Sequence, residues 1–158
     1  MYKNLLGILV IFFAFSSPPA ISQTQNDELY SLSGKCTKFI NRKNDVTRHC
    51  LSKLASFTLK NGRVGFIFTI GSYATFQFSG SGQHQEKISK NATGQPLDRV
   101  TFTLLGMGNK TKPNILLVQR GACAYSNPYI GIATVICEAK TKLGTFSAAF
   151  ETDGQPPQ

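Results

Sequence analysis

Four cysteines carry the clearest chemistry of this sequence, because they can form disulfides. Cys36 is followed by Cys50 fourteen residues later, Cys123 is followed by Cys137 at the same spacing, and each pair begins with Gly-x-Cys. The repeated spacing favours two local bridges, each of which contributes about 3 kcal/mol by restricting the unfolded chain. The open alternative ties the N-terminal segment to the C-terminal strands, through Cys36–Cys123 or Cys36–Cys137. Zinc is not expected, since its cysteine ligands usually lie within a few residues of each other.

The chain offers few residues that could act as catalytic groups. The two histidines are His49, beside Cys50, and His84, in a polar segment near Glu86. A Cys–His nucleophile is disfavoured because adjacent strand residues point to opposite faces, and because a disulfide-bonded cysteine is not a thiolate. His84 and Glu86 alone are a weak indication of a metal or active site. We therefore predict a protein that is not an enzyme and that uses neither a cofactor nor a metal.

The first 22 residues have the layout of a secretory signal peptide. Lys3 precedes an apolar run over 5–15, Ser and Pro residues interrupt the run, and Ala20 and Ser22 precede Gln23. We predict cleavage between Ser22 and Gln23 and a secreted or periplasmic protein, in a compartment where disulfides persist. The apolar run is shorter than the roughly 20 residues that cross a bilayer as a helix, so no transmembrane segment is expected.

Residues 23–153 are long enough for a single β-rich domain, and residues 154–158 are expected to form a disordered tail. Short alternating apolar segments, separated by Gly, Asn and Pro, run through the domain. Beyond the hairpin considered next, they lie at 74–79, 99–104, 114–119, 132–138 and 145–151. This spacing predicts an all-β fold, either a small antiparallel sandwich or a barrel of about eight strands, strengthened by the disulfides.

The most specific local signal is Asn61-Gly62 between two alternating runs, which predicts a β-hairpin with a two-residue turn. In that register Lys60 faces Arg63, and Phe57 faces Phe66. One face of the hairpin would then be buried, and it would carry Phe57, Leu59, Val64, Phe66 and Phe68.

Two segments have weaker patterns. Residues 45–55 fit either a short helix capped by Asp45 or a strand that continues into the hairpin, and we favour the strand. Residues 83–96 are polar and lack periodicity, so we expect them to form a disordered loop.

Positive charge is concentrated in one part of the chain. The sequence has 17 Lys and Arg against 8 Asp and Glu, and the segment 35–63 holds eight of the basic residues but only one acidic residue, Asp45. Such an excess attracts anions, although it can also serve solubility alone. A disulfide between Cys36 and Cys50 would present Arg42 and Lys43 on a fixed turn.

We therefore predict a binding module that engages an anionic partner through this basic segment. The expected partners are an anionic polysaccharide, an anionic lipid surface or an acidic protein. Nucleic acid is not expected, since stacking aromatic residues are scarce among the charges. The predicted contact residues are Lys38, Arg42, Lys43, Arg48, Lys60 and Arg63.

The alternative surface is the segment Tyr125-Ser126-Asn127-Pro128-Tyr129. Asn-Pro favours a turn, and tyrosine offers a large contact area at low entropic cost. Tyr125 and Tyr129 could thus form the contact loop of a protein-directed inhibitor or adhesion module, or they could simply cover the edge of the core.

Overall fold

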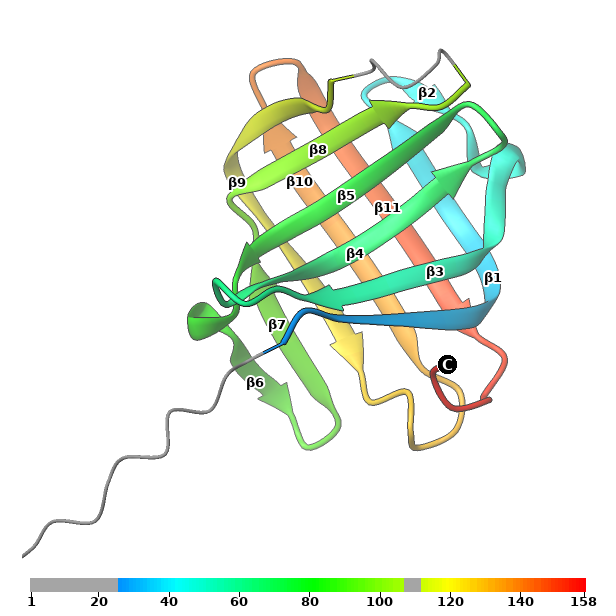
Figure 1. Ribbon diagram of the computed structural model, residues 1–158, viewed down its shortest axis with the longest axis vertical. Helices are drawn as coiled ribbons and strands as arrows, with labels where there is room; N and C mark the ends of the chain where they lie inside the picture. Colours follow the sequence, from blue (N-terminus) through cyan, green and yellow to red (C-terminus); the bar gives the residue numbers. More distant parts are fainter. Residues whose placement is uncertain (1–25, 107–111) are drawn as a thin grey trace, which may run out of the picture.

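The computed structural model describes residues 26–106 and 112–158, which form an all-β fold (Figure 1). The expected signal peptide, residues 1–22, lies outside the described residues. Within the two described ranges we find no helix with the length and apolar character that a membrane crossing requires. The elements are β1 (Glu28–Asn41), β2 (Asn44–Asp45), the 3₁₀ turn η1 (Thr47–His49), β3 (Cys50–Thr58), β4 (Arg63–Ile70), β5 (Ala74–Ser81), the 3₁₀ turn η2 (Gly82–His84), β6 (Glu86–Ser89), β7 (Ala92–Pro96), β8 (Arg99–Leu104), β9 (Asn114–Ser126), β10 (Thr134–Thr141) and β11 (Gly144–Thr152).

Eight of these strands close into an antiparallel barrel, which confirms the predicted fold class and selects the barrel over the sandwich. The order around the barrel is β10, β11, β1, β3, β4, β5, β8 and β9, and β9 then pairs with β10. The two longest strands are each shared between neighbours. β1 pairs first with β3 and then with β11, and β9 pairs first with β8 and then with β10. Among the described residues, each strand of the barrel therefore has a paired neighbour on both sides over at least part of its length.

Phenylalanine fills most of the barrel interior. Phe39 on β1 is fully buried, and its ring centre lies between 5.0 and 6.4 Å from those of Phe68, Phe76 and Phe78. Phe146 enters the same cluster from β11, against Phe76. Aromatic pairs at these separations add about 0.5–1.5 kcal/mol each beyond the burial of their area.

Both disulfides are local, as the repeated spacing predicts. Cys36–Cys50 joins β1 to the start of β3, and the two Cα atoms are 5.9 Å apart. Cys123–Cys137 joins β9 to β10, where the two residues are direct cross-strand partners with Cα atoms 4.0 Å apart. Each bridge therefore involves one of the two long, shared strands.

The hairpin at Asn61-Gly62 forms, but its predicted register is wrong by one residue. The amide of Leu59 donates to the carbonyl of Arg63, and the amide of Gly62 donates to the carbonyl of Leu59, both at 2.8 Å. The loop therefore has three residues, and Gly62 takes the left-handed conformation with φ 75°. This is the geometry of a type I turn followed by a left-handed residue, which sequence alone did not separate from a two-residue turn.

The register shift moves Phe57 to the outer face of the barrel, where it pairs with Gly65 rather than Phe66. Glycine is needed at position 65, because a Cβ atom there would collide with the backbone carbonyl oxygen of Phe78 and would come within 2.9 Å of the Phe57 ring. Phe57 is nevertheless buried, with 5% of its surface exposed, so its predicted burial is correct although its predicted face is not. Phe66 and Phe68 point inward, as predicted.

Residues 83–96 are not a disordered loop, in contrast to the prediction. They form η2 and the hairpin β6–β7, and β7 pairs with the second half of β9 (Figure 1). Backbone pairing with β9 orders this segment despite its lack of apolar periodicity. Residues 45–55 consist of the end of β2, the turn η1 and most of β3, so the favoured strand is present from Cys50 onward.

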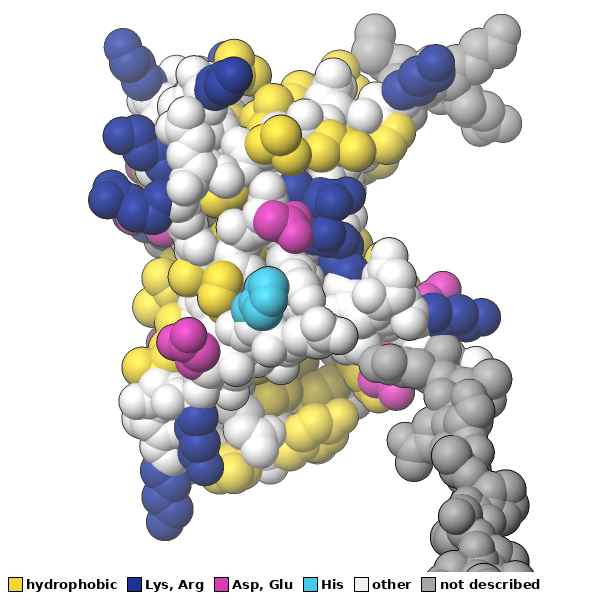
Figure 2. Space-filling model, turned by 90° about the vertical axis from the view of Figure 1, so that its left-hand side faces the viewer, with side chains coloured by type: hydrophobic (Ala, Val, Ile, Leu, Met, Phe, Trp, Pro, Cys, Tyr) yellow, Lys and Arg dark blue, Asp and Glu magenta, His cyan; other side chains and the backbone are white. Residues whose placement is uncertain are grey.

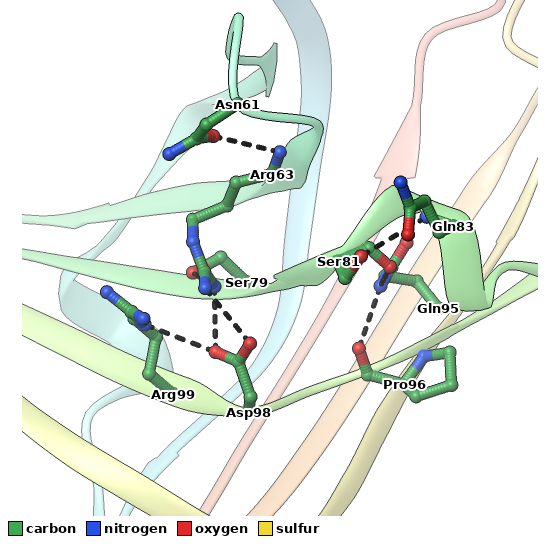
Figure 3. Close-up of polar contacts among 9 residues, drawn as sticks. All are labelled: Asn61, Arg63, Ser79, Ser81, Gln83, Gln95, Pro96, Asp98 and Arg99. Atoms are coloured by element: carbon green, nitrogen blue, oxygen red, sulfur yellow. Dashed lines mark hydrogen bonds and ion pairs between the residues drawn. The ribbon is translucent and has the colours of Figure 1, made fainter.

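Side-chain hydrogen bonds of Gln95 link β7 to the end of β5 (Figure 3). Its side chain is fully buried, and its Nε2 atom donates to the carbonyl oxygens of Ser81 at 3.0 Å and Pro96 at 2.8 Å. Its Oε1 atom has no hydrogen-bond partner among the described residues. The amide therefore bridges two strands at the place where the β6–β7 hairpin leaves the barrel.

Residues 154–158, expected to be a disordered tail, instead run back to β1. The amide and carbonyl of Gln158 exchange hydrogen bonds with Ser31, at 3.0 and 2.7 Å, and the amide of Asp153 donates to Ser33. These backbone contacts hold the segment near the end of the barrel where β1 begins.

Replacing Gln95 by leucine should lower the free energy of unfolding by about 0.5–1.5 kcal/mol, because the carbonyl oxygens of Ser81 and Pro96 lose the donor that links β5 to β7. Urea denaturation measures the change. Gln83→Leu is the matched control, since this exposed glutamine lies in the same segment and its replacement should alter stability by less than about 0.5 kcal/mol. Equal stability of Gln95→Leu and the wild-type protein would contradict the bridging role.

Candidate binding surfaces

The predicted basic contact residues do not form one surface. Arg42 and Lys43 occupy the turn between β1 and β2, and Arg48 lies in η1 near the same end of the barrel. Lys60 lies beyond the far end of β3, whose nine residues span about 30 Å. Figure 1 shows the two regions at opposite ends of the molecule. Lys38 projects from the outer face of β1, where it is exposed.

Arg63 is committed to a structural ion pair (Figure 3). Its Nη1 and Nη2 atoms donate to the two carboxylate oxygens of Asp98 at 2.7 and 3.0 Å, which joins β4 to the residue preceding β8. Arg99 adds a third contact, with Nε 3.1 Å from Asp98 Oδ1. The hydrogen bond from Arg63 is the largest of the effects that hold the pKa of Asp98 below its usual range. Arg63 is therefore unsuited to bind an external anion.

The turn that carries Arg42 lies against the turn between β10 and β11. Arg42 has a left-handed backbone, with φ 62°, and a Cβ atom added at Gly144 would lie 3.2 Å from Arg42 Cγ. Lys142 is in that second turn. Lys140, two residues earlier, is the direct cross-strand partner of Arg120 on β9.

The structure thus gathers a set of exposed cations that we call the basic end, namely Arg42, Lys43, Arg120, Lys140 and Lys142. Within the described ranges, none of the five takes part in an ion pair. Two acidic residues, Asp45 and Glu138, are near neighbours in the strand pairing, so they reduce the net charge without removing it. Like charges placed directly opposite each other destabilise a sheet, and Lys140 opposite Arg120 is such a pair.

An exposed aliphatic groove adjoins the basic end. Ile115 and Leu117 on β9 and Leu143 in the β10–β11 turn are 54, 74 and 55% exposed. Together with Lys142 they line a groove of about 350 Å³ between the start of β9 and that turn. Figure 2 shows hydrophobic side chains beside Lys and Arg side chains in the upper half of this face. Contiguous exposed aliphatic side chains of this kind often mark an interaction site.

Tyr125 and Tyr129 do not form a single exposed loop. Tyr125 is half-buried on β9 and faces inward, with its ring centre 5.1 Å from that of Phe66. Its hydroxyl accepts a hydrogen bond from Gln85 Nε2 at 2.8 Å, and burial raises its pKa. Tyr129 is exposed in the connection after β9. The two residues nevertheless line the same cavity at this end of the barrel.

The histidines lie apart from both surfaces. His49 accepts a hydrogen bond from Arg48 Nε at 3.0 Å and meets Tyr73 edge-on, while His84 is exposed in η2. Across 26–106 and 112–158, no three His, Cys, Asp or Glu side chains gather as metal ligands would.

The fold therefore defines the chain as a closed, eight-stranded antiparallel β-barrel with two disulfides and distinct surfaces at its two ends. No family model, no curated protein and no solved structure matches it significantly.

The Arg63–Asp98 pair makes stability depend on pH. Folding lowers the pKa of Asp98. The ionised carboxylate therefore contributes fully to the free energy of unfolding above the ordinary aspartate pKa of about 4. This contribution is lost as the pH falls through the lowered pKa of the folded protein. Asp98→Asn should therefore unfold more easily than wild type at about pH 7, by no more than about 1 kcal/mol for this half-exposed carboxylate, and the difference should shrink as the pH falls below about 4.

Urea denaturation over this pH range tests the prediction. The control is Glu138→Gln, which removes an exposed carboxylate that has no ion pair among the described residues. A stability deficit of Asp98→Asn that stays constant from neutral to acid pH would show that the ion pair is not its cause.

Proposed function

We propose that this chain is an exported, non-enzymatic protein that binds anionic lipid surfaces through its basic end. The observation that supports the proposal is the adjacency of five exposed cations and an exposed aliphatic groove. Two disulfides are compatible with an oxidising extracellular or periplasmic location.

A lipid surface fits this end better than the other anionic partners. A polysaccharide supplies charge but no apolar phase for Ile115, Leu117 and Leu143. The interface of a bilayer supplies both, since aliphatic side chains can enter the acyl boundary while cations remain among the headgroups. Each Lys or Arg near an anionic leaflet contributes about 1 kcal/mol, so the five cations can sum to substantial affinity.

The proposed contact set only partly matches the one expected from the sequence. Arg42 and Lys43 belong to it, and Lys38 lies beside it on the outer face of β1. Arg48 lies in η1, near Tyr73 rather than near the groove. Lys60 is at the opposite end, and Arg63 is paired with Asp98.

A second candidate is protein binding through the connection after β9. Tyr129, Ile130 and Ile132 are each about two-thirds exposed, which favours an apolar contact. Such binding would depend little on salt, since apolar contacts are not screened as exposed charges are. Tyr125, which faces inward, would not take part directly.

Co-sedimentation with phospholipid vesicles tests the lipid proposal. We expect binding to vesicles that contain phosphatidylglycerol, weak binding to pure phosphatidylcholine, and loss of binding at high salt. The Arg42→Glu/Lys142→Glu variant should bind anionic vesicles at least about tenfold more weakly. Leu117→Ser/Leu143→Ser should also weaken binding, about tenfold, because less apolar area is buried.

The matched control is Lys60→Glu/Lys87→Glu, which changes net charge equally but at the other end of the barrel. An equal loss of binding in this control would show that overall charge, rather than the basic end, is responsible. If dextran sulfate binds as tightly as the vesicles do, and the double serine variant binds it unchanged, the partner is a polyanion instead of a lipid surface.

A further inference from the structure

The barrel interior is not filled at the end that carries the connection between β9 and β10. The inward position 56 on β3 is a serine, although its cross-strand neighbours are Tyr30 and Phe66. Ala133, the residue immediately before β10, is similarly small and is buried. These small side chains leave a cavity of about 190 Å³, whose walls include Leu32, Ser56, Phe66, Tyr125, Ala133 and Val135.

A row of side chains leads from solvent into this cavity. Lys87 on β6 pairs with Thr93 on β7, Thr93 pairs with Tyr125 on β9, and Tyr125 pairs with Val135 on β10. Directly paired residues point to the same face of a sheet, so these four side chains share one face. The row passes from a cation through two hydroxyl groups to an aliphatic side chain. Glu86 is one residue away on β6, where strand alternation turns it to the opposite face, and it also contributes to the rim of the outer hollow that Lys87 lines.

Tyr125 lies at the boundary between the cavity and an outer hollow. Its ring packs against Phe66, inside the barrel, whereas its hydroxyl is bonded to Gln85, which lines the hollow. The hollow is about 430 Å³, and Lys87 is among its lining residues. In Figure 2 a recess with hydrophobic side chains on its floor is visible in the lower half of the molecule.

We propose that this end of the barrel binds a small aromatic carboxylate, with its ring in the cavity and its carboxylate at the Tyr125 hydroxyl and Lys87. The site uses the end opposite the basic end, so it is independent of lipid binding. Mouths of β-barrels are common ligand sites, and an apolar cavity with a few convergent polar groups is the usual form of such a site.

The size and polarity of the cavity favour a single aromatic ring as the part of the ligand that it holds. An apolar cavity of about 150 Å³ accommodates benzene, so 190 Å³ holds one six-membered ring with little room to spare. Most of the wall is apolar, and the hydroxyl oxygens of Ser126 and Thr152 already accept hydrogen bonds from the amides of Thr134 and Ala133.

The polar groups of the row, Tyr125 and Lys87, favour a ligand that carries a carboxylate. Tyr125 accepts from Gln85, so its own O–H proton can be donated to a ligand oxygen. Lys87 lies on the same face as Tyr125 and can supply the counter-charge. A charge-assisted hydrogen bond is stronger than a neutral one, which favours a carboxylate over an alcohol.

Titration of the intact protein with benzoate, followed by NMR, tests the proposal. Benzoate should bind saturably at a single site, benzyl alcohol should bind more weakly, and acetate, which lacks the ring, should not bind. Ser56→Phe fills the cavity and should abolish binding. Ala133→Leu, a second filling variant, should reduce affinity at least about tenfold, and it keeps the test valid should the bulkier change impair folding.

Two further variants test the contribution of the polar contacts to binding without changing the cavity. Lys87→Gln and Tyr125→Phe should each weaken benzoate binding about tenfold, and Lys87→Gln should leave the affinity for benzyl alcohol unchanged. Lys142→Gln, which removes the same charge at the other end, should have no effect. Absence of saturable benzoate binding up to about 10 mM, or binding that is unchanged in the filled and Lys87→Gln variants, would overturn the proposal.

Discussion

Pairing of β9 with β10 closes the barrel, and the other features of the molecule depend on that closure. To complete it, β9 pairs with β8 over its first residues and with β10 thereafter, and β1 divides its length between β3 and β11 in the same way. The disulfides lie on these two shared strands. Cys123–Cys137 bridges the closing pair itself, where backbone pairing and a covalent bond restrain the same residues.

Closure also determines where binding can occur. Around the barrel each strand pairs with two neighbours, and phenylalanine side chains fill most of the interior, so the two ends remain as distinct surfaces. Tight turns at one end bring Arg42 and Lys142 together beside exposed aliphatic side chains. At the other end the inward positions become small, while β6 and β7 extend the wall outward past Tyr125. One end is therefore suited to a surface, and the other to a small molecule.

The fold class and the disulfides could be predicted because both leave local patterns, namely alternation within strands and a repeated spacing between cysteines. The hairpin register could not, because it depends on whether Gly62 alone, or both turn residues, take a positive φ. The charged surface was misjudged for a different reason. Sequence proximity placed Lys60 with Arg42, although a whole strand separates them, and it missed Arg120 and Lys140, which only the β9–β10 pairing brings together. The inward direction of Tyr125 was hidden by the same long-range pairing.

We propose above that the protein binds a lipid surface through its basic end. This proposal is tested most directly by NMR of the isotope-labelled protein with anionic bicelles that carry a paramagnetic lipid. If the basic end binds the bilayer, line broadening will be concentrated at the amides of Ile115, Leu117, Lys142 and Leu143, with little effect at Tyr129 and Ile130. Broadening centred on the connection after β9, or spread evenly over the barrel, would contradict the proposal.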